Sequence, residues 1–304
     1  MRSPASPRRS SVESTRRSDG VRLAVPNKGR IADPIMDLLE RSGLHVTGSG
    51  DRRLFARTLD PGVELLFARP IDIPAYVASG AADLGITGFD MVEERGVRVE
   101  DLLDLNIGRA TLVLAVLEES GVRAPEDLAG ARVATEFPNL AARYFADAGV
   151  AVELVPVAGA CELAPHLGIA DAILDLSSSG TTLRTNRLRV VAEVLRSSTR
   201  LIGNPAAVRE KAGKIGELVM ALESVVLARG QCYLMMNVDR AHLAEVEEVL
   251  PGLGGPTVMP VASRDDAVAV HAVVAETEVY GLIPRLKRAG AKDILVISIE
   301  RMIR

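Results

Sequence analysis

The chain has little cysteine and few aromatic residues, and both shortages exclude whole classes of protein. Its two cysteines, Cys161 and Cys232, lie far apart and belong to no metal-ligand spacing, which argues against a disulfide scaffold or a zinc site. Aromatic residues make up 3% of the chain and its net charge is −4, so base stacking and nonspecific attraction to nucleic acid are not expected. No apolar run approaches the roughly 20 residues that span a bilayer. We therefore expect a cytoplasmic protein that binds neither nucleic acid nor membrane.

The first twenty residues differ in composition from the rest, because they are rich in Ser, Arg and Pro and almost free of apolar side chains. A secretory signal needs an apolar segment after its basic start, and none follows. An organellar transit segment is the alternative, but the composition favours a disordered leader over residues 1–20 or a mis-assigned start codon. The folded part is expected to begin at Val21.

From Val21 onward, short apolar runs alternate with glycine-containing turns and helical patterns, which indicates an α/β fold. Residues 21–113 with 193–229 predict one lobe and residues 114–192 a second, joined by crossing strands near 112–117 and 189–195. Proteins of this type bind small ligands at the carboxyl ends of strands and in clefts between domains.

Residues 230–304 follow a different pattern. Their apolar runs and helical spacings predict the order β-α-β-β-α-β, which is the ferredoxin-like plan. This unit is too small for a catalytic cleft of its own, so we expect it to serve regulation or assembly.

The segment from Asp171 to Leu183 carries the chemistry. Ala172-Ile173-Leu174 predicts a buried strand, and the charge of Asp175 at its end suits a cleft better than a core. Residues 177–182 offer five hydroxyls and a glycine, so their N–H and O–H groups can surround phosphate oxygens. The neighbouring carboxylate suits ribose hydroxyls or Mg²⁺. Such runs are also typical of exposed turns, and from composition alone the two interpretations are evenly balanced.

This segment resembles the signature of the ATP phosphoribosyltransferases. The matching positions are Glu162, Gly168, Ala170, Ile173, Asp175, Leu176, Ser179, Gly180, Thr182 and Leu183. The resemblance extends to residues 27–30, to Arg69 with 72–74, to 83–90, to 133–135 with 138–140, and to 201–205. It implies transfer of the phosphoribosyl group of 5-phosphoribosyl 1-pyrophosphate to N1 of ATP, with release of pyrophosphate and use of Mg²⁺, in the first step of histidine biosynthesis.

The resemblance also implies an architecture. The two catalytic lobes of this family are similar to periplasmic binding proteins, and its long form adds a C-terminal ACT-like domain that binds histidine as feedback inhibitor. The predicted β-α-β-β-α-β unit places the chain with the long form, which assembles as homodimers and homohexamers.

Site residues are carried over from the resemblance position by position. Those implied for phosphoribosyl pyrophosphate are Asp175, Ser178, Ser179, Gly180, Thr181, Thr182 and Leu183. The candidate catalytic acids are Asp171, Asp175 and Glu162, of which Asp171 and Asp175 are also candidate Mg²⁺ ligands. Those implied for the nucleotide are Lys28, Gly29, Arg30, Arg69, Asp72, Gly88 and Asp90.

Each of these assignments has an ordinary structural alternative. Basic residues in turns are more often simply solvated, and Glu162 also fits a solvated helix face. The four histidines form no catalytic or ligand spacing. As a different class of function, two lobes with an ACT-like domain fit a solute-binding sensor. A periplasmic binder would need an export signal, and a sensor acting on DNA would need a basic reading module; the sequence shows neither.

Overall fold

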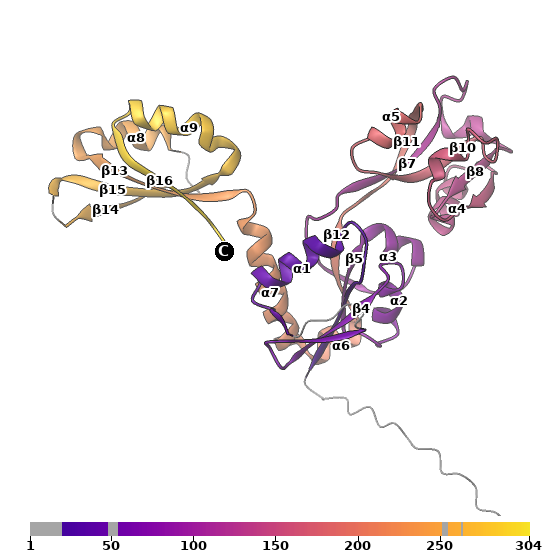
Figure 1. Cartoon of the computed structure of the whole chain (residues 1–304), viewed down its shortest axis with the longest axis horizontal. Helices are drawn as coiled ribbons and strands as arrows, with labels where there is room; N and C mark the ends of the chain where they lie inside the picture. The colour runs from indigo at the N-terminus through magenta and orange to yellow at the C-terminus, as the bar shows by residue number, and fades with distance from the viewer. Residues whose placement is uncertain (1–19, 48–53, 251–254, 263) are drawn as a thin grey trace, which may run out of the picture.

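The computed structural model describes residues 20–47, 54–250, 255–262 and 264–304, so the expected leader lies outside the described residues except for Gly20. Figure 1 shows three units, each built on its own sheet: lobe I, lobe II and a C-terminal domain. Their sheets have seven, five and four strands. The predicted fold class, two α/β lobes followed by a ferredoxin-like domain, is confirmed.

Lobe I has β1 (Val21–Pro26) at the centre of its sheet, paired in parallel with β4 and β5. Its strand order is β2-β3-β4-β1-β5-β12-β6. The other strands are β2 (Val46–Thr47), β3 (Phe55–Thr58), β4 (Val63–Ala68), β5 (Leu84–Gly88), β6 (Glu100–Asp104) and β12 (Thr199–Gly203). The short strands β2 and β6 at the edges of the sheet, and β3 beside β2, did not appear in the sequence pattern, because such strands carry little of the apolar signal.

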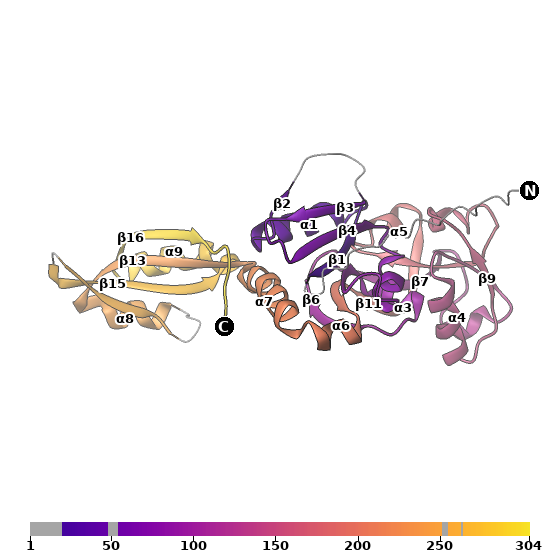
Figure 2. The same ribbon diagram turned by 90° about the horizontal axis from the view of Figure 1, so that it is seen from below.

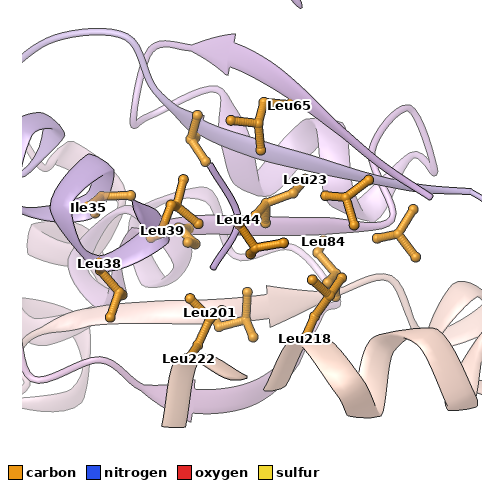
Figure 3. Close-up of a cluster of buried hydrophobic side chains, with 14 of the residues drawn as sticks. Leu23, Ile35, Leu38, Leu39, Leu44, Leu65, Leu84, Leu201, Leu218 and Leu222 are labelled. Atoms are coloured by element: carbon orange, nitrogen blue, oxygen red, sulfur yellow. The ribbon is translucent and has the colours of Figure 1, made fainter. Parts of the chain in front are cut away.

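Helices cover both faces of this sheet. Side chains of α1 and α7 pack with Leu23 and Leu65 on one face, and side chains of α2 and α3 pack with Ala24 on the other. The helices are α1 (Ala32–Arg41), α2 (Ile73–Ala78), α3 (Phe89–Arg95), α6 (Pro205–Glu210) and α7 (Ala212–Ala228). Figure 3 shows leucines from strands and helices meeting in the larger core. Strands that are buried on both faces must be apolar almost throughout, which explains the continuous apolar runs.

Lobe II is a five-stranded sheet in the order β11-β7-β10-β8-β9. Strands β9, β8 and β10 are parallel, whereas β7 and β11 run antiparallel to their neighbours. The strands are β7 (Ala110–Leu117), β8 (Arg132–Thr135), β9 (Glu153–Pro156), β10 (Ala172–Ser177) and β11 (Leu188–Ser197). The helical segments are η1 (Pro125–Leu128), α4 (Pro138–Asp147), η2 (Cys161–Leu163) and α5 (Thr181–Thr185).

Two connections join the lobes, and both lie nearer to lobe I than the sequence predicted. β7 and β11 pair with each other along their full lengths within the sheet of lobe II. The chain therefore crosses at residues 105–109 and at Ser198, rather than at 113–114 and 192–193. The apolar runs marked the crossing strands correctly, but they contain no information about the sheet in which a strand pairs.

The C-terminal domain has the predicted order of elements: β13 (Gln231–Asp239), α8 (Leu243–Val249), β14 (Thr257–Val261), β15 (Arg264–Ala275), α9 (Glu276–Arg288) and β16 (Ala291–Ser298), with the short turn η3 (Arg240–His242) before α8. Its strands lie in the order β14-β15-β13-β16. Both helices cover one face, where Val246, Leu282 and Leu286 pack against Leu234 and Val270.

The C-terminal domain is joined to lobe I at two places. The helix predicted over 205–229 is two helices with a break at Lys211, and the second, α7, leads directly into β13 (Figure 2). Beyond β16 the chain returns to lobe I, where the Met302 N–H donates to the Ser224 carbonyl at 2.8 Å. Arg301 Nε donates to the carbonyl of Arg41 at 2.7 Å, at the end of α1.

Close packing of α2 against the sheet of lobe I can be tested at Gly85. A Cβ there would lie 2.5 Å from Ile73 Cγ2 and 2.7 Å from Val77 Cγ2, and both side chains are fully buried. Gly85→Ala is expected to lower the free energy of unfolding by about 1–3 kcal/mol. Gly216→Ala is the control, because it lies exposed in α7 with nothing within 4 Å of its Cβ. Denaturant unfolding should show Gly216→Ala stabilised by roughly 0.5–1 kcal/mol; equal effects would contradict the packing.

Candidate active site

In lobe I, the residues predicted for the nucleotide follow three neighbouring parallel strands. β1 leads into residues 27–30, β4 into Arg69, and β5 into the Gly88–Asp90 turn. Pro26 pairs with Ala68, so the first two strands end side by side. Lys28, Gly29, Arg30 and Arg69 are exposed. The structure thus brings these cationic side chains to one edge of the sheet, where phosphate groups are readily bound.

Asp90 is buried beneath this edge. Its backbone N–H donates to the Ser197 hydroxyl at 3.0 Å, and that hydroxyl donates to the Asp90 carboxylate. Burial raises the pKa of Asp90, and the Ser197 hydrogen bond and the Arg30 charge oppose that rise. Gly88 must be glycine here because a Cβ would collide with the Asp90 carboxylate. Gly88 and Asp90 are therefore one structural unit.

Asp72 is engaged within lobe I. Its carboxylate accepts a hydrogen bond from Arg95 Nη2 at 2.9 Å, and Arg95 Nε donates to the Ile71 carbonyl at 2.8 Å. The Thr87 hydroxyl donates to the Pro70 carbonyl at 2.8 Å. These bonds fix the turn that carries Arg69 against β5 and α3, so Asp72 supports the edge.

In lobe II, the predicted phosphate loop follows β10 and opens α5. Ser178, Ser179, Thr181 and Thr182 are exposed, while Leu183 is buried and anchors the loop to the core. Gly180 has φ +70°, a left-handed conformation that glycine adopts without strain. Its N–H donates to the Ser177 hydroxyl at 3.1 Å, which closes the turn.

Arg184 folds back onto this loop. Its guanidinium donates to the Ser179 carbonyl and to the Thr181 hydroxyl, each at 3.2 Å. A cation thus lies beside hydroxyls and backbone N–H groups that suit phosphate oxygens. Arg184 was missed in the sequence because it directly follows the signature, in a short helix that the sequence pattern did not predict.

Asp175 lies toward the carboxyl end of β10, half-buried, with its carboxylate accepting from the Leu176 N–H at 2.7 Å. Burial raises its pKa to about 6; the charges of Glu136 and Glu162 act in the same direction, against the Leu176 and Cys161 hydrogen bonds. Glu162 is thus near Asp175, as expected. Glu136 was not predicted, although it follows β8 as Asp175 ends β10, and Leu174 pairs with Thr135.

Asp171 lies at the other end of the same strand and is not brought to the loop. Its carboxylate accepts from the Arg132 backbone N–H at 2.9 Å and from the Arg132 guanidinium at 3.2 Å. These bonds lower the pKa of Asp171. The expectation that Asp171 and Asp175 share ribose or Mg²⁺ is corrected by geometry, because four steps along an extended chain separate the two residues by roughly 13 Å.

A pocket of about 340 Å³ lies where the crossing strands leave lobe II. Ser178 of the loop lines it together with Arg109, Arg196, Arg200 and Asp104. Arg200 pairs with Asp101 and Asp104 at 3.1 and 3.4 Å and lies over the Phe89 ring. Three arginines and one aspartate line the pocket, but Arg200 is paired with these two aspartates and Arg196 with Glu193 at 2.9 Å. Sequence reasoning missed it because its lining comes from four separated segments.

The described part of the chain contains neither a membrane-spanning helix nor a metal-holding group of side chains. Within residues 20–47, 54–250, 255–262 and 264–304, no helix is long and apolar enough to cross a membrane. Over the same residues, no group of three or more His, Cys, Asp or Glu side chains is arranged to hold a metal ion.

Fold and site together define a two-lobed α/β protein whose polar strand ends suit phosphate-bearing ligands. The sequence model of the family described as ATP phosphoribosyltransferase matches residues 69–224, and that of the HisG C-terminal domain matches residues 228–301. The ATP phosphoribosyltransferase of Methanocella arvoryzae is 54% identical over 284 residues, covering 93% of this chain and 100% of the relative. That of Natronomonas pharaonis is 56% identical over 283 residues, with the same coverage.

Among solved structures, the chain is similar to one from the ATP phosphoribosyl transferase (HisG:HisZ) complex of Thermotoga maritima. The TM-score is 0.61 at 29% identity, and the match covers 68% of this chain and 98% of that chain. The chain therefore belongs to the ATP phosphoribosyltransferase family, a family of transferases, and its C-terminal domain places it with the long form.

The raised pKa of Asp175 predicts that this residue lowers the stability of the fold at high pH. The native carboxyl, with pKa about 6, holds its proton to higher pH than the unfolded one, so stability falls as pH rises from about 4 to 6 and stays lower above. Asp175→Asn should therefore be more stable than the unmodified protein at pH 8, by about 1–2 kcal/mol for a half-buried group, and equal to it near pH 4.

Asp171→Asn is the matched control for this experiment. The pKa of Asp171 is lowered, so its charge stabilises the fold above the unfolded pKa, and its loss should slightly destabilise the protein at pH 8. Thermal unfolding at pH 4, 6 and 8 measures both variants. A destabilised Asp175→Asn at pH 8 would contradict the assignment.

Proposed function

We propose that the protein is an ATP phosphoribosyltransferase that transfers the phosphoribosyl group of 5-phosphoribosyl 1-pyrophosphate to N1 of ATP. The products are phosphoribosyl-ATP and pyrophosphate, and the reaction is the first step of L-histidine biosynthesis. The observation that carries the proposal is the pairing of a hydroxyl-rich loop with the half-buried Asp175 at one strand end. Family membership supports the same reaction.

The 5-phosphate is assigned to residues 178–182. Ser178, Ser179, Thr181 and Thr182 are exposed at the loop, and Leu183 holds the loop in place. Arg184 already donates to two oxygens of this loop, so a phosphate there would exchange neutral oxygen acceptors for charged ones. Charge-assisted hydrogen bonds are roughly twice as strong as neutral ones.

The ribose hydroxyls and Mg²⁺ are assigned to Asp175, with Glu162 as the second acidic contact. Glu136 belongs to the same group, because both glutamates raise the pKa of Asp175. A cation near them would relieve this repulsion, but among the described residues these three carboxylates do not by themselves form a group that could hold a metal ion. Mg²⁺ commonly binds through one or two carboxylates plus substrate phosphates, and when bound it would neutralise charge on the pyrophosphate.

The nucleotide is assigned to the edge of lobe I, at Lys28, Gly29, Arg30, Arg69, Gly88 and Asp90, with Asp72 holding the turn. Displacement at the anomeric carbon builds positive charge on the sugar and negative charge on the departing pyrophosphate. Asp175 is placed to stabilise the first, and the pocket lined by Arg109 and Arg196 is placed to bind the second. Catalysis therefore rests on positioning and electrostatics.

Feedback inhibition by histidine and assembly are assigned to the C-terminal domain. The face of its sheet opposite the helices is uncovered, and Met235, Met259, Leu295 and Ile297 are 37–54% exposed there. Exposed apolar faces of this kind mark association surfaces, which supports a homodimer or homohexamer. We place the protein in the cytoplasm, with its nucleotide and sugar-phosphate substrates.

The reaction is tested by incubating the protein with ATP, phosphoribosyl pyrophosphate and Mg²⁺ and following phosphoribosyl-ATP by its ultraviolet absorbance.

Gly180→Ala should raise the KM for phosphoribosyl pyrophosphate about tenfold, because a left-handed backbone is strained by a side chain and its Cβ would lie 2.9 Å from Arg184 Nη1. Gly149→Ala has the same strain, with φ +69°, in open space away from the loop, and should leave that KM unchanged. Binding without turnover would favour a solute-binding protein.

The route of inhibition is tested at the tail. Arg301 connects the C-terminal domain to the end of α1, and α1 follows the Lys28–Arg30 turn. Arg301→Ala should weaken inhibition by histidine at least severalfold, with little change in uninhibited activity. Arg285→Ala, exposed on α9, is the control, and the oligomeric state is measured alongside. Full inhibition of Arg301→Ala would exclude the tail as the connection.

A further inference from the structure

Two carboxylates are buried on α3, and one of them, Glu94, has no part in the proposed reaction. Among the described residues, Asp90 and Glu94 are the only buried charged side chains, with 6% and 5% exposed. Both lie on α3, four residues apart and therefore on one face of the helix. A buried carboxylate destabilises the fold unless it is hydrogen-bonded. The hydrogen-bond partners of Asp90 and Glu94 therefore indicate what these residues do.

Glu94 finds its partners in the other lobe. Its carboxylate accepts from the backbone N–H groups of Asn139 at 3.1 Å and Leu140 at 2.9 Å, in the first turn of α4. α4 has no side-chain cap of its own. A carboxylate of lobe I thus satisfies N–H groups that would otherwise lack partners, at the positive end of a ten-residue helix.

Two further bonds surround this contact. Asn139 Nδ2 donates to the Glu94 carbonyl at 3.2 Å, and Arg143 Nη2 donates to the Glu93 carbonyl at 2.6 Å. One turn earlier, Asp90 is bonded to Ser197 at the end of β11, a strand of the lobe II sheet. The same face of α3 therefore contacts both α4 and the crossing strand.

We propose that Glu94 is a positioning residue that holds lobe II against lobe I at the separation the two substrates require. Glu94 is one helical turn after Asp90, and Asn139 is three residues after Glu136. The contact therefore ties the nucleotide edge of lobe I to the acidic edge of lobe II. The inference rests on the proposed function, in which each lobe binds one substrate.

A kinetic signature separates this role from simple support of the fold. If the Glu94 contact with α4 is lost, the two lobes adopt the arrangement that binds both substrates for only part of the time. The apparent affinity for each substrate is then reduced by that fraction. The KM values for both substrates then rise by the same factor. Saturating substrates restore the arrangement, so kcat is retained. Simple loss of stability would instead reduce the fraction of folded, active enzyme. The apparent kcat would then fall and both KM values would stay unchanged.

The variant for this test is Glu94→Gln, which keeps the size of the side chain but turns an NH₂ group toward a backbone N–H. We expect both KM values to rise about fivefold, with kcat within about twofold of the unmodified enzyme. The matched control is Asp127→Asn. Asp127 also accepts two backbone N–H groups, from Arg123 at 2.7 Å and Ala124 at 3.0 Å, but within lobe II. Its KM values should not change.

A second variant and a second measurement keep the test independent of folding and of activity. Arg143→Ala removes an exposed contact between the same helices and should raise both KM values about twofold. Spin labels at Asp37→Cys and Asp147→Cys, both exposed, report the distance between lobes in protein diluted with unlabelled chains; the native cysteines are buried. Glu94→Gln should broaden this distance distribution.

The proposal is overturned if Glu94→Gln leaves the KM values and the distance distribution unchanged, or if Asp127→Asn changes them equally. If Glu94→Gln does not fold, unchanged values for Arg143→Ala overturn it. An unmodified protein without transferase activity would refute the proposed function, and the label distances would still decide whether Glu94 holds the lobes.

Discussion

A parallel strand buried on both faces can expose polar groups only at its ends, and this constraint organises both lobes. β1, β4 and β5 in lobe I and β8 and β10 in lobe II are covered by helices or apolar side chains along their lengths. Their turns are therefore the only places where phosphate-binding groups stay solvated without a cost to the core. This constraint explains why the cationic groups of lobe I and the acidic and hydroxyl groups of lobe II both lie at strand ends.

The same constraint gives the carboxylates different roles according to their burial. Asp171, exposed and paired with Arg132, stabilises its end of β10. Asp175, on the same strand, is half-buried among acidic neighbours and has a raised pKa. A group that destabilises the free protein and gains a cation or hydroxyl partner on binding is typical of a functional site. Asp90 and Glu94 are buried more deeply and act between lobes.

Much of the site could be predicted because its residues are contiguous in sequence. The loop from Asp175 to Leu183 and the turns at residues 27–30 and 88–90 follow apolar runs, and strand ends converge by geometry alone. Glu136, Arg184 and the pocket arginines were not predicted. Each is an ordinary charged residue in a turn or strand, and nothing local separates it from a solvated one. α3 was also missed, since it is short and two of its charged residues face inward.

By itself, the sequence determined the classes of structure: apolar runs separated by turns required buried strands, and the β-α-β-β-α-β order required a ferredoxin-like domain. It also determined which loop carries hydroxyls beside a carboxylate. Only the tertiary structure decided which carboxylates meet. Asp171 and Asp175 are close in sequence yet lie at opposite ends of a strand, because an extended chain carries them apart. Glu94 and Leu140 are distant in sequence yet bonded, because the two lobes meet there.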